Sequence, residues 1–420
     1  MWYTILHMPI QEIVFYGLSF LSIYVQIFLL ITFIERRKEI KYRTGQHIDL
    51  KEYPSVTVVV PCWNEEKTIG GTIESLLALD YPSDKVNIIL VDDGSTDNTW
   101  NVMQGYIGNP QITAYQKENG GKHTAMNLGI SKTTTPFIGC LDADSFVDHQ
   151  ALKRIMTYFD DTEVMAVSPA IIVTKPKNVV QRIQKIEYHW GIYTKKMLGL
   201  NGAIHVAPGP FSIFRTSVFA KIGNFKKAHN TEDMEIAYRM QANHMKIEHA
   251  NDAFVYTVTP NTVKKLYKQR LRWIYGFIQN TIDYRRLLFK KEYGNFGYFT
   301  LPSGVLSVVS VVFIFFFTIY NIGHFIVQQT IKISTVGVSL PTATHIFDPF
   351  YINTKAITIV TLVLYGTVIL AMLIGSRMAE GKPKFSFSFI WFFIIYSVIA
   401  PFWLMKAVYN TVFAKKTAWR

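Results

Sequence analysis

The chain alternates between long uncharged apolar stretches and one long block of mixed polar and apolar positions. Residues 13–34 carry no charged side chain and are followed at once by Glu35-Arg36-Arg37-Lys38. About 20 consecutive apolar residues suffice to cross a bilayer as a helix. Further stretches of this kind lie at residues 301–327, 356–374 and 387–412. The pattern predicts a multi-pass membrane protein with a soluble block, residues 51–295, between the membrane segments.

Basic residues beside the first stretch predict how the chain crosses the membrane. Cytosolic loops carry an excess of Lys and Arg, so we expect the soluble block in the cytosol and the first stretch to be a retained signal-anchor. The rule fails at the other end, because three spans after the block would place Lys415, Lys416 and Arg420 outside. Pro401 and Lys406 break the last stretch, and three interpretations of it stay open: a fourth span, an interfacial segment or a re-entrant segment.

Within the soluble block, short apolar runs alternate with segments whose apolar residues recur at helical spacing. The predicted strands and helices are residues 56–60, 68–79, 86–91, 124–130 and 137–141, of which the second and fourth are helices. This alternation is typical of α/β proteins, whose parallel strands are buried on both faces. We therefore predict an α/β fold.

Segments that contain acidic residues directly follow three of the predicted strands. They are Pro61-Cys62-Trp63-Asn64-Glu65-Glu66, Asp92-Asp93 and Asp142-Ala143-Asp144. The carboxyl ends of parallel strands share one edge of a sheet, where such sheets bind ligands. Two carboxylates two residues apart suit Mg²⁺ or Mn²⁺, which prefer carboxylate oxygens together with phosphate oxygens. The spacing predicts a metal and diphosphate site, although Asp92-Asp93 followed by glycine is also typical of a helix-capping turn.

The distribution of charge predicts a contact with the membrane surface. The net charge is +13, and many basic residues crowd the segment before the second apolar stretch. They are Lys264, Lys265, Lys268, Arg270, Arg272, Arg285, Arg286, Lys290 and Lys291. We expect them to attract anionic lipid, and several spans disfavour a nucleic-acid partner. Segments near residues 179–200 and 262–284 are predicted to be amphipathic helices at the membrane interface.

Two further motifs carry candidate chemistry. Thr231-Glu232-Asp233 begins a helical pattern, so Asp233 lies in a first turn, where an acid complements the helix dipole and can also act as a general base. In Gln269-Arg270-Leu271-Arg272-Trp273, Gln269 and Arg272 share a helix face, and arginine offers a fork matched to phosphate. Trp273 has two interpretations, stacking on a sugar ring or anchoring the helix at the membrane interface.

Six motifs occur in an order that resembles the membrane-bound, processive, inverting family-2 glycosyltransferases. They are P-C-W-N-E-E, V-D-D-G-S-T-D, N-G-G-K-H-T-A-M-N, L-D-A-D, T-E-D and Q-R-L-R-W. Among these enzymes the chain is most similar to poly-N-acetylglucosamine synthases, and it also resembles hyaluronan, chitin and cellulose synthases. The resemblance implies a GT-A (Rossmann-like) domain over residues 51–295, in the cytosol at the plasma membrane, between transmembrane regions at residues 1–40 and 296–420.

The same resemblance implies roles for individual residues. Those implied to bind the donor nucleotide are Trp63, Glu65, Asp92, Lys122, Asp142 and Arg272. Those implied to hold Mg²⁺ or Mn²⁺ are Asp142 and Asp144, and those implied to bind the acceptor are Gln269, Trp273 and Glu232. Asp233 is implied to be the catalytic base that takes the proton of the acceptor hydroxyl.

These expectations describe a hexosyltransferase that polymerises a sugar, N-acetylglucosamine by resemblance, from a UDP-sugar and moves the glycan across the membrane. Its partners are then the UDP-sugar, the growing glycan and membrane lipid, with a small accessory membrane subunit left open. Two alternatives remain: a non-processive membrane enzyme that places one sugar on a lipid, and a non-catalytic assembly protein with a degenerate transferase domain. The intact acidic motifs count against the second alternative.

Overall fold

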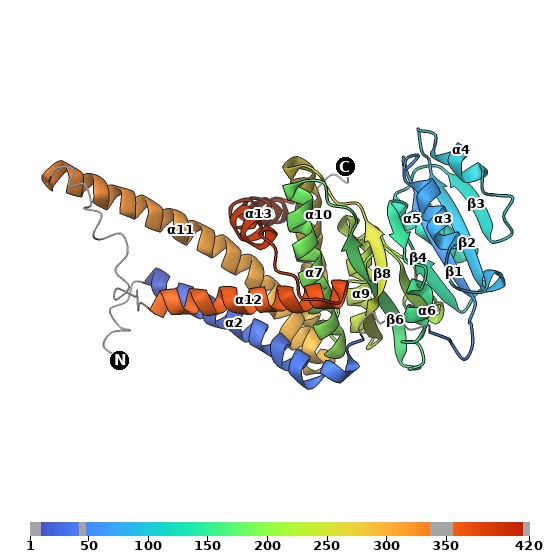
Figure 1. Ribbon diagram of the computed structural model, residues 1–420, viewed down its shortest axis with the longest axis horizontal. Coiled ribbons are helices and arrows are strands. Elements are labelled where there is room, and N and C mark those ends of the chain that lie inside the picture. Colours follow the sequence, from blue (N-terminus) through green and yellow to red (C-terminus); the bar gives the residue numbers. More distant parts are fainter. Residues whose placement is uncertain (1–9, 42–47, 337–355, 415–420) are drawn as a thin grey trace.

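The computed structural model describes residues 10–41, 48–336 and 356–414. Its soluble part is built on an eight-stranded sheet with the order β3-β2-β1-β4-β7-β6-β8-β5 (Figure 1). The strands are β1 (Val56–Cys62), β2 (Val86–Asp93), β3 (Ile112–Lys117), β4 (Phe137–Cys140), β5 (Ser145–Val147), β6 (Val164–Val173), β7 (Ser212–Arg215) and β8 (Lys246–Thr257). Strands β1 to β4 are parallel, whereas β7 is antiparallel to both of its neighbours. The predicted α/β fold is confirmed.

Both faces of the parallel half of the sheet are buried, which explains the uninterrupted apolar runs in the sequence. Along β1, Val56, Val58 and Val60 face an apolar cluster that includes α3 (Ile69–Leu77). Val59 faces the opposite cluster, which includes α5 (Lys122–Ser131). The polar residues that follow β1, β2 and β4 consequently emerge together at one edge of the sheet.

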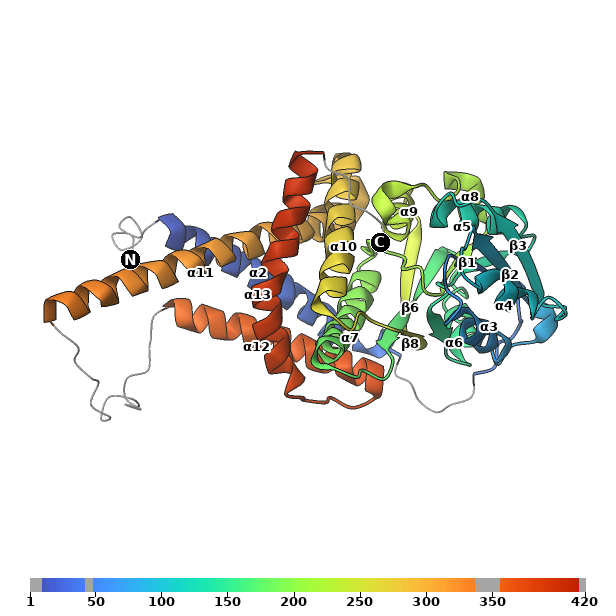
Figure 2. The same ribbon diagram turned by 90° about the horizontal axis from the view of Figure 1, so that it is seen from above.

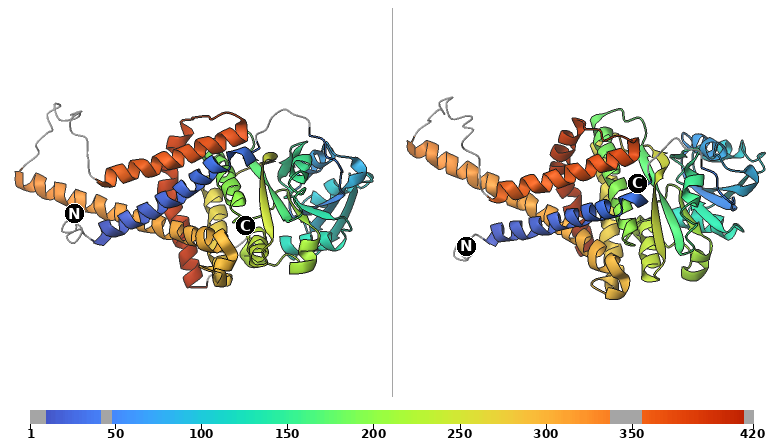
Figure 3. Two further views of the ribbon diagram at one scale, coloured as in Figure 1. Left: turned by 90° about the horizontal axis from the view of Figure 1, so that it is seen from below. Right: turned by 60° about the horizontal axis from the view of Figure 1, so that its bottom comes forward.

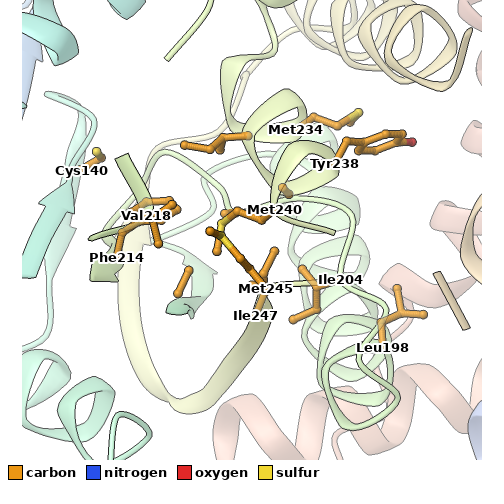
Figure 4. Packing of buried hydrophobic residues seen from close by; sticks show 14 of the residues in the cluster. Cys140, Leu198, Ile204, Phe214, Val218, Met234, Tyr238, Met240, Met245 and Ile247 are labelled. Carbon is orange, nitrogen blue, oxygen red and sulfur yellow. The ribbon is translucent and has the colours of Figure 1, made fainter. Parts of the chain in front are cut away.

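The other helices of the soluble part cover the sheet or lie between it and the long apolar helices. They are α4 (Thr99–Gln104), α6 (Ala151–Met156), α7 (Val179–Leu200), α8 (Ser217–Ile222), α9 (Glu232–Ala242) and α10 (Val263–Asp283). Figure 4 shows how apolar side chains of α9, such as Met240, gather with Phe214 of β7 and Ile247 of β8. This packing fixes α9 against the sheet.

Four of the described helices are long and apolar enough to cross a membrane. They are α2 (Ile10–Glu35), α11 (Leu301–Val336), α12 (Ala356–Glu380) and α13 (Ser388–Val412). In the views of Figures 1, 2 and 3, α2, α11 and α12 leave the soluble part in the same general direction. Helix α13 instead runs across that direction, beside α10.

Pro401 and Lys406 interrupt the apolar stretch but not its helix, because α13 is continuous through both positions. The side chain of Pro401 is buried, and α7 and α10 pack along the helix. Contacts with neighbouring helices of this kind support a helix that contains proline.

The packing of α5 on β1 depends on a glycine. A Cβ at position 129 would lie 2.3 Å from Cγ1 of Val59. We expect Gly129→Ala to lower stability by about 1–3 kcal/mol, the usual cost of overpacking, seen as a lower midpoint of thermal unfolding. Gly108→Ala is the matched control, because nothing lies within 4 Å of a Cβ at position 108. Equal losses in both variants would contradict the packing argument.

Candidate active site

A cavity of about 1100 Å³ lies at the carboxyl ends of β1, β2 and β4, with α7 and α10 forming its other side. Several residues singled out in the sequence line it: Trp63, Glu65, Lys122, Asp142, Asp144, Gln269 and Arg272. The structure therefore brings strand-end acids and one face of a distant helix into a single space. The shared orientation predicted for Gln269 and Arg272 is observed.

The described lining does not include Asp92, Glu232, Asp233 or Trp273. Asp92 is fully buried, and its carboxylate accepts hydrogen bonds from the backbone N–H of Ser95 (3.1 Å) and from Nε2 of Gln116 (3.0 Å). Asp92 thus holds the turn after β2 in shape. Its contact with a nucleotide stays a prediction.

Asp93 also lines the cavity, a position for which the sequence motifs predicted no role. Its carboxylate accepts hydrogen bonds from Nζ of Lys117 (2.6 Å) and from the backbone N–H groups of Gly120 (3.1 Å) and Gly121 (2.9 Å). These bonds fix the glycine loop that leads into α5. The signal for this contact in the sequence is the pair of glycines directly before a helix.

Lys122 is the cation that joins the two acidic groups of the site. Its Nζ lies 2.5 Å from Oδ1 of Asp142 and 3.4 Å from Oε1 of Glu232. Burial alone would lower the pKa of Lys122, but the nearby carboxylates, led by Asp142, raise it above its ordinary value. Gly209 leaves room for this arrangement, since a Cβ there would lie 2.6 Å from Nζ of Lys122. The ammonium group therefore stays charged.

The strand-end acids have the chemistry of a divalent-cation site. Burial, together with the negative charges of Asp142 and Glu65, raises the pKa of Asp144 to about 6. A divalent cation would offset this concentrated negative charge, so the residues suit Mg²⁺ or Mn²⁺. Among the residues that the structure describes, no three His, Cys, Asp or Glu side chains are grouped to hold a metal. A cation here would therefore take further ligands from phosphate or water.

Asp233 lies in the first turn of α9, as the sequence pattern predicted. Its side chain is half-buried, and its Oδ1 accepts a hydrogen bond from the backbone N–H of Met234 (3.0 Å). Burial, supported by the charge of Glu232, raises the pKa of Asp233 to about 6, and Lys122 acts in the opposite direction. A carboxyl group with this pKa is ionised at neutral pH and can still accept a proton.

Helix α10 fixes the segment that leads into α9. Gly276 leaves space for Thr231, whose Oγ1 would lie 2.3 Å from a Cβ at that position. Nδ2 of Asn280 donates a hydrogen bond to Oγ1 of Thr231 (3.0 Å), and the guanidinium of Arg272 donates to the carbonyl of Asn230 (3.0 Å). The start of α9 is therefore clamped to α10 at more than one point.

Arg270 orders the rest of the α10 motif. Its guanidinium donates a hydrogen bond to Oε1 of Gln269 (2.8 Å) and lies 4.2 Å from the ring centroid of Trp273. It also donates to Oε2 of Glu187 in α7 (2.6 Å), which accepts a second bond from the hydroxyl of Tyr396 in α13. No local sequence pattern indicates Glu187 or Tyr396, because both lie far from Arg270 along the chain.

Comparison with known proteins indicates a family for part of the chain. The family model described as Glycosyl transferase family 2 matches residues 57–223. These residues form a family-2 glycosyltransferase domain. The family-2 domain includes Asp142 and Asp144, whereas Asp233 and α10 lie beyond the matched residues.

Two curated relatives extend the similarity beyond this domain. Poly-beta-1,6-N-acetyl-D-glucosamine synthase from Staphylococcus aureus (strain COL) is 31% identical over 244 residues, which are 57% of this chain and 59% of that protein. The protein of the same name from Staphylococcus epidermidis is 28% identical over 260 residues, 61% of this chain and 63% of that protein. The chain thus spans less than two thirds of the length of these relatives.

A solved structure shows the same fold. The mannosyltransferase from Pyrobaculum calidifontis, in complex with GDP-Man and Mn²⁺, is 16% identical, with a TM-score of 0.59 over 96% of this chain and 99% of that chain. At this identity the likeness shows the fold alone. It confirms the GT-A-like fold that the family resemblance implied, here with candidate membrane helices on both sides of the domain.

The ion pair between Glu187 of α7 and Arg270 of α10 is expected to stabilise the packing of these two helices. Arg270 is 4% exposed and Glu187 24%, so Glu187→Gln leaves a buried guanidinium without this carboxylate charge. We expect a loss of about 3 kcal/mol, at the low end for breaking a buried pair, measured by thermal unfolding. Asp161→Asn is the control, because its ion pair with Lys246 is solvent-exposed and adds little stability. Similar effects of both changes would contradict a stabilising role for the buried pair.

Proposed function

We propose that this protein is a processive, inverting glycosyltransferase that polymerises N-acetylglucosamine from a UDP-sugar and moves the glycan across the membrane. The observation that carries the proposal is the single cavity that joins Asp142 and Asp144 to Gln269 and Arg272 of α10. The proposed donor site and the proposed acceptor site are thereby adjacent, as a displacement reaction requires. The names of the staphylococcal relatives support the choice of sugar.

The donor diphosphate is proposed to lie between the strand-end acids and the cations of Lys122 and Arg272. Asp144 is the stronger candidate for a direct metal ligand, because Oδ1 of Asp142 is already paired with Lys122. Mg²⁺ or Mn²⁺ held there would offset the negative charge that builds on the departing diphosphate. The two cationic side chains would stabilise the same charge from the protein side.

The nucleoside is proposed to contact the loops after β1 and β2. Trp63 and Glu65 line the cavity on the first of these loops. On the loop after β2, Asp92 holds the turn through its hydrogen bond with Ser95, and Asp93 fixes the glycine loop beside Lys122. Both loops rest on the buried parallel strands, which gives the nucleoside site a rigid base.

Asp233 is proposed to be the general base. The acceptor hydroxyl oxygen attacks C1 of the donor sugar, the bond between C1 and the diphosphate oxygen breaks, and the hydroxyl proton passes to the carboxylate of Asp233. A single displacement on the face opposite the leaving group inverts C1. Glu232, on the same turn of α9, is proposed to orient this region through Lys122.

The growing glycan is proposed to lie along α10. Gln269 lines the cavity, and Trp273 follows one turn later with its ring held by Arg270. The apolar helices would supply the lipid contacts and the path by which the glycan leaves. The basic residues after the first of them favour a cytosolic domain at the plasma membrane, and a small accessory membrane subunit stays an open partner.

A product assay tests the proposal. The protein in nanodiscs is given UDP-N-acetylglucosamine, UDP-glucose or UDP-glucuronate, each with and without Mg²⁺ or Mn²⁺, and both UDP release and product size are measured. We expect UDP release from UDP-N-acetylglucosamine only with the cation, and a polymer as product. Turnover without a cation would contradict the metal site. If the product is a lipid that carries one sugar, the polymerase proposal is wrong and the non-processive alternative is supported. If no donor releases UDP, the protein is not an enzyme of this class.

The role of Asp233 gives a second prediction. Asp233→Asn keeps the shape of the side chain but cannot take a proton, so transfer should fall by about 10²–10⁴-fold while UDP binding, measured by calorimetry, changes little. In the unmodified protein the rate should fall as pH is lowered through about 6, because Asp233 is ionised above this pKa and protonated below it. Protonation of Asp144, whose pKa is also about 6, acts in the same direction. Asp84→Asn, at an exposed position, is the control. Retained transfer in Asp233→Asn would remove Asp233 as the base.

A further inference from the structure

Helix α13 differs in direction from the other long apolar helices. Helices α2, α11 and α12 extend away from the soluble part together, whereas α13 lies across them, alongside α10 (Figures 1, 2 and 3). If the three aligned helices cross the bilayer, then α13 lies across that direction and along the membrane. Its 25 residues would reach across a bilayer at about 1.5 Å each, so its length does not decide between the two placements.

One face of α13 packs on the protein, and the opposite face is apolar and exposed. Phe392, Trp403 and Ala407 are buried, and the helix packs along α10 and α7. The outer face carries large apolar residues at helical spacing, each 50–80% exposed: Phe387, Trp391, Ile394, Val398, Phe402 and Val412. An apolar strip of this length is unfavourable in water. Lipid is the solvent that suits it, because α13 also packs against α11, which is long and apolar enough to cross a membrane.

Basic residues flank both ends of α13. Lys382 and Lys384 precede it, and Lys415, Lys416 and Arg420 follow it in the sequence. A spanning helix would place its ends on opposite sides of the membrane, and the preference of Lys and Arg for the cytosolic side would be violated at one of them. A helix in the plane of the membrane keeps both ends on the cytosolic side. An in-plane α13 therefore agrees with the preference of Lys and Arg for the cytosolic side, which four spans would violate.

The start of α13 has the chemistry of the headgroup region. A hollow of about 490 Å³ lies there between α7 and α13. It is lined by a cation, two hydroxyl residues and apolar, mainly aromatic side chains: Arg182, Ser386, Ser388, Val179, Phe385, Phe387 and Trp391. A guanidinium beside exposed aromatic rings suits lipid phosphate and the layer just below it. This places one end of α13 at the membrane surface, as an in-plane helix requires.

We propose that α13 is an in-plane membrane helix on the side of the catalytic domain, with its outer face in the lipid leaflet. The described part of the chain then crosses the membrane with α2, α11 and α12, and the residues that follow α13 lie on the same side as the family-2 domain. Tyr396 of α13 shares Glu187 with Arg270 of α10, so the lipid-bound helix also supports the α10 wall of the cavity.

Depth measurements test this placement without any use of catalytic activity. Single cysteines at Ile394, Val398 and Val412 carry a nitroxide, and its depth in nanodiscs with anionic lipid is measured from relaxation by oxygen and by a water-soluble reagent. The native Cys62 and Cys140 are buried, and burial raises the pKa of Cys140 to about 12, so neither competes for the label. We expect one depth for all three labels, within about 5 Å. A spanning helix would separate the outer two by about 27 Å, and that spread would overturn the proposal.

Helix α12 provides the matched control. Leu362 and Leu370 are both exposed on this helix, and labels at these positions should differ in depth by about 12 Å because α12 crosses the bilayer. Equal depths in α12 would contradict the alignment of the three crossing helices, and with it the in-plane placement of α13.

The side of the C-terminus gives an independent test. In sealed vesicles, an impermeant maleimide should label a cysteine added after Arg420 from the same side as Ser83→Cys, an exposed reference in the catalytic domain. Labelling from the opposite side would overturn the proposal. Strong coupling between nitroxides at Val398 of two molecules, with no relaxation by oxygen, would show that a second copy covers the outer face and would overturn the lipid contact.

Discussion

The positive charge of Lys122 is the interaction on which the site depends. Its Nζ lies between Asp142, just after β4, and Glu232, at the start of α9, so one cation connects the sheet to the helix that carries Asp233. Without this cation, Asp142 and Glu232 would lose their nearest counter-charge, and repulsion among the acids would favour protonation or separation. The glycine loop before α5 and the close approach of Gly209 both serve to keep the ammonium group where it is.

Features set by local spacing could be predicted from the sequence. Uninterrupted apolar runs are typical of strands buried on both faces, and β1, β2 and β4 lie where those runs occur. Asp142 and Asp144 line one cavity because both lie in the short turn directly after β4, and Gln269 and Arg272 do so because residues three apart share a helix face. In each case the geometry of one element decides the outcome.

Features set by tertiary contacts could not be predicted in this way. Whether Asp92 or Asp93 faces the cavity depends on one residue of register at the end of β2, and a shift of one residue reverses it. Glu187 meets Arg270 only because α7 packs beside α10. Hydropathy likewise identified α13 as a helix that prefers lipid, but the direction of a helix in the membrane follows from its packing against neighbours.

Three sides of helix α10 make contacts on which the site depends. One side presents Gln269 and Arg272 to the cavity, a second holds the lead into α9 through Gly276 and Asn280, and a third packs against α13. A substitution in these 21 residues that adjusted the helix to a thicker or more charged bilayer would also displace the acids of the site. Adaptation of this chain to a different membrane is therefore expected to occur through the outward residues of α13 and α12, where a change in lipid contact leaves the positions of the reacting groups unaltered.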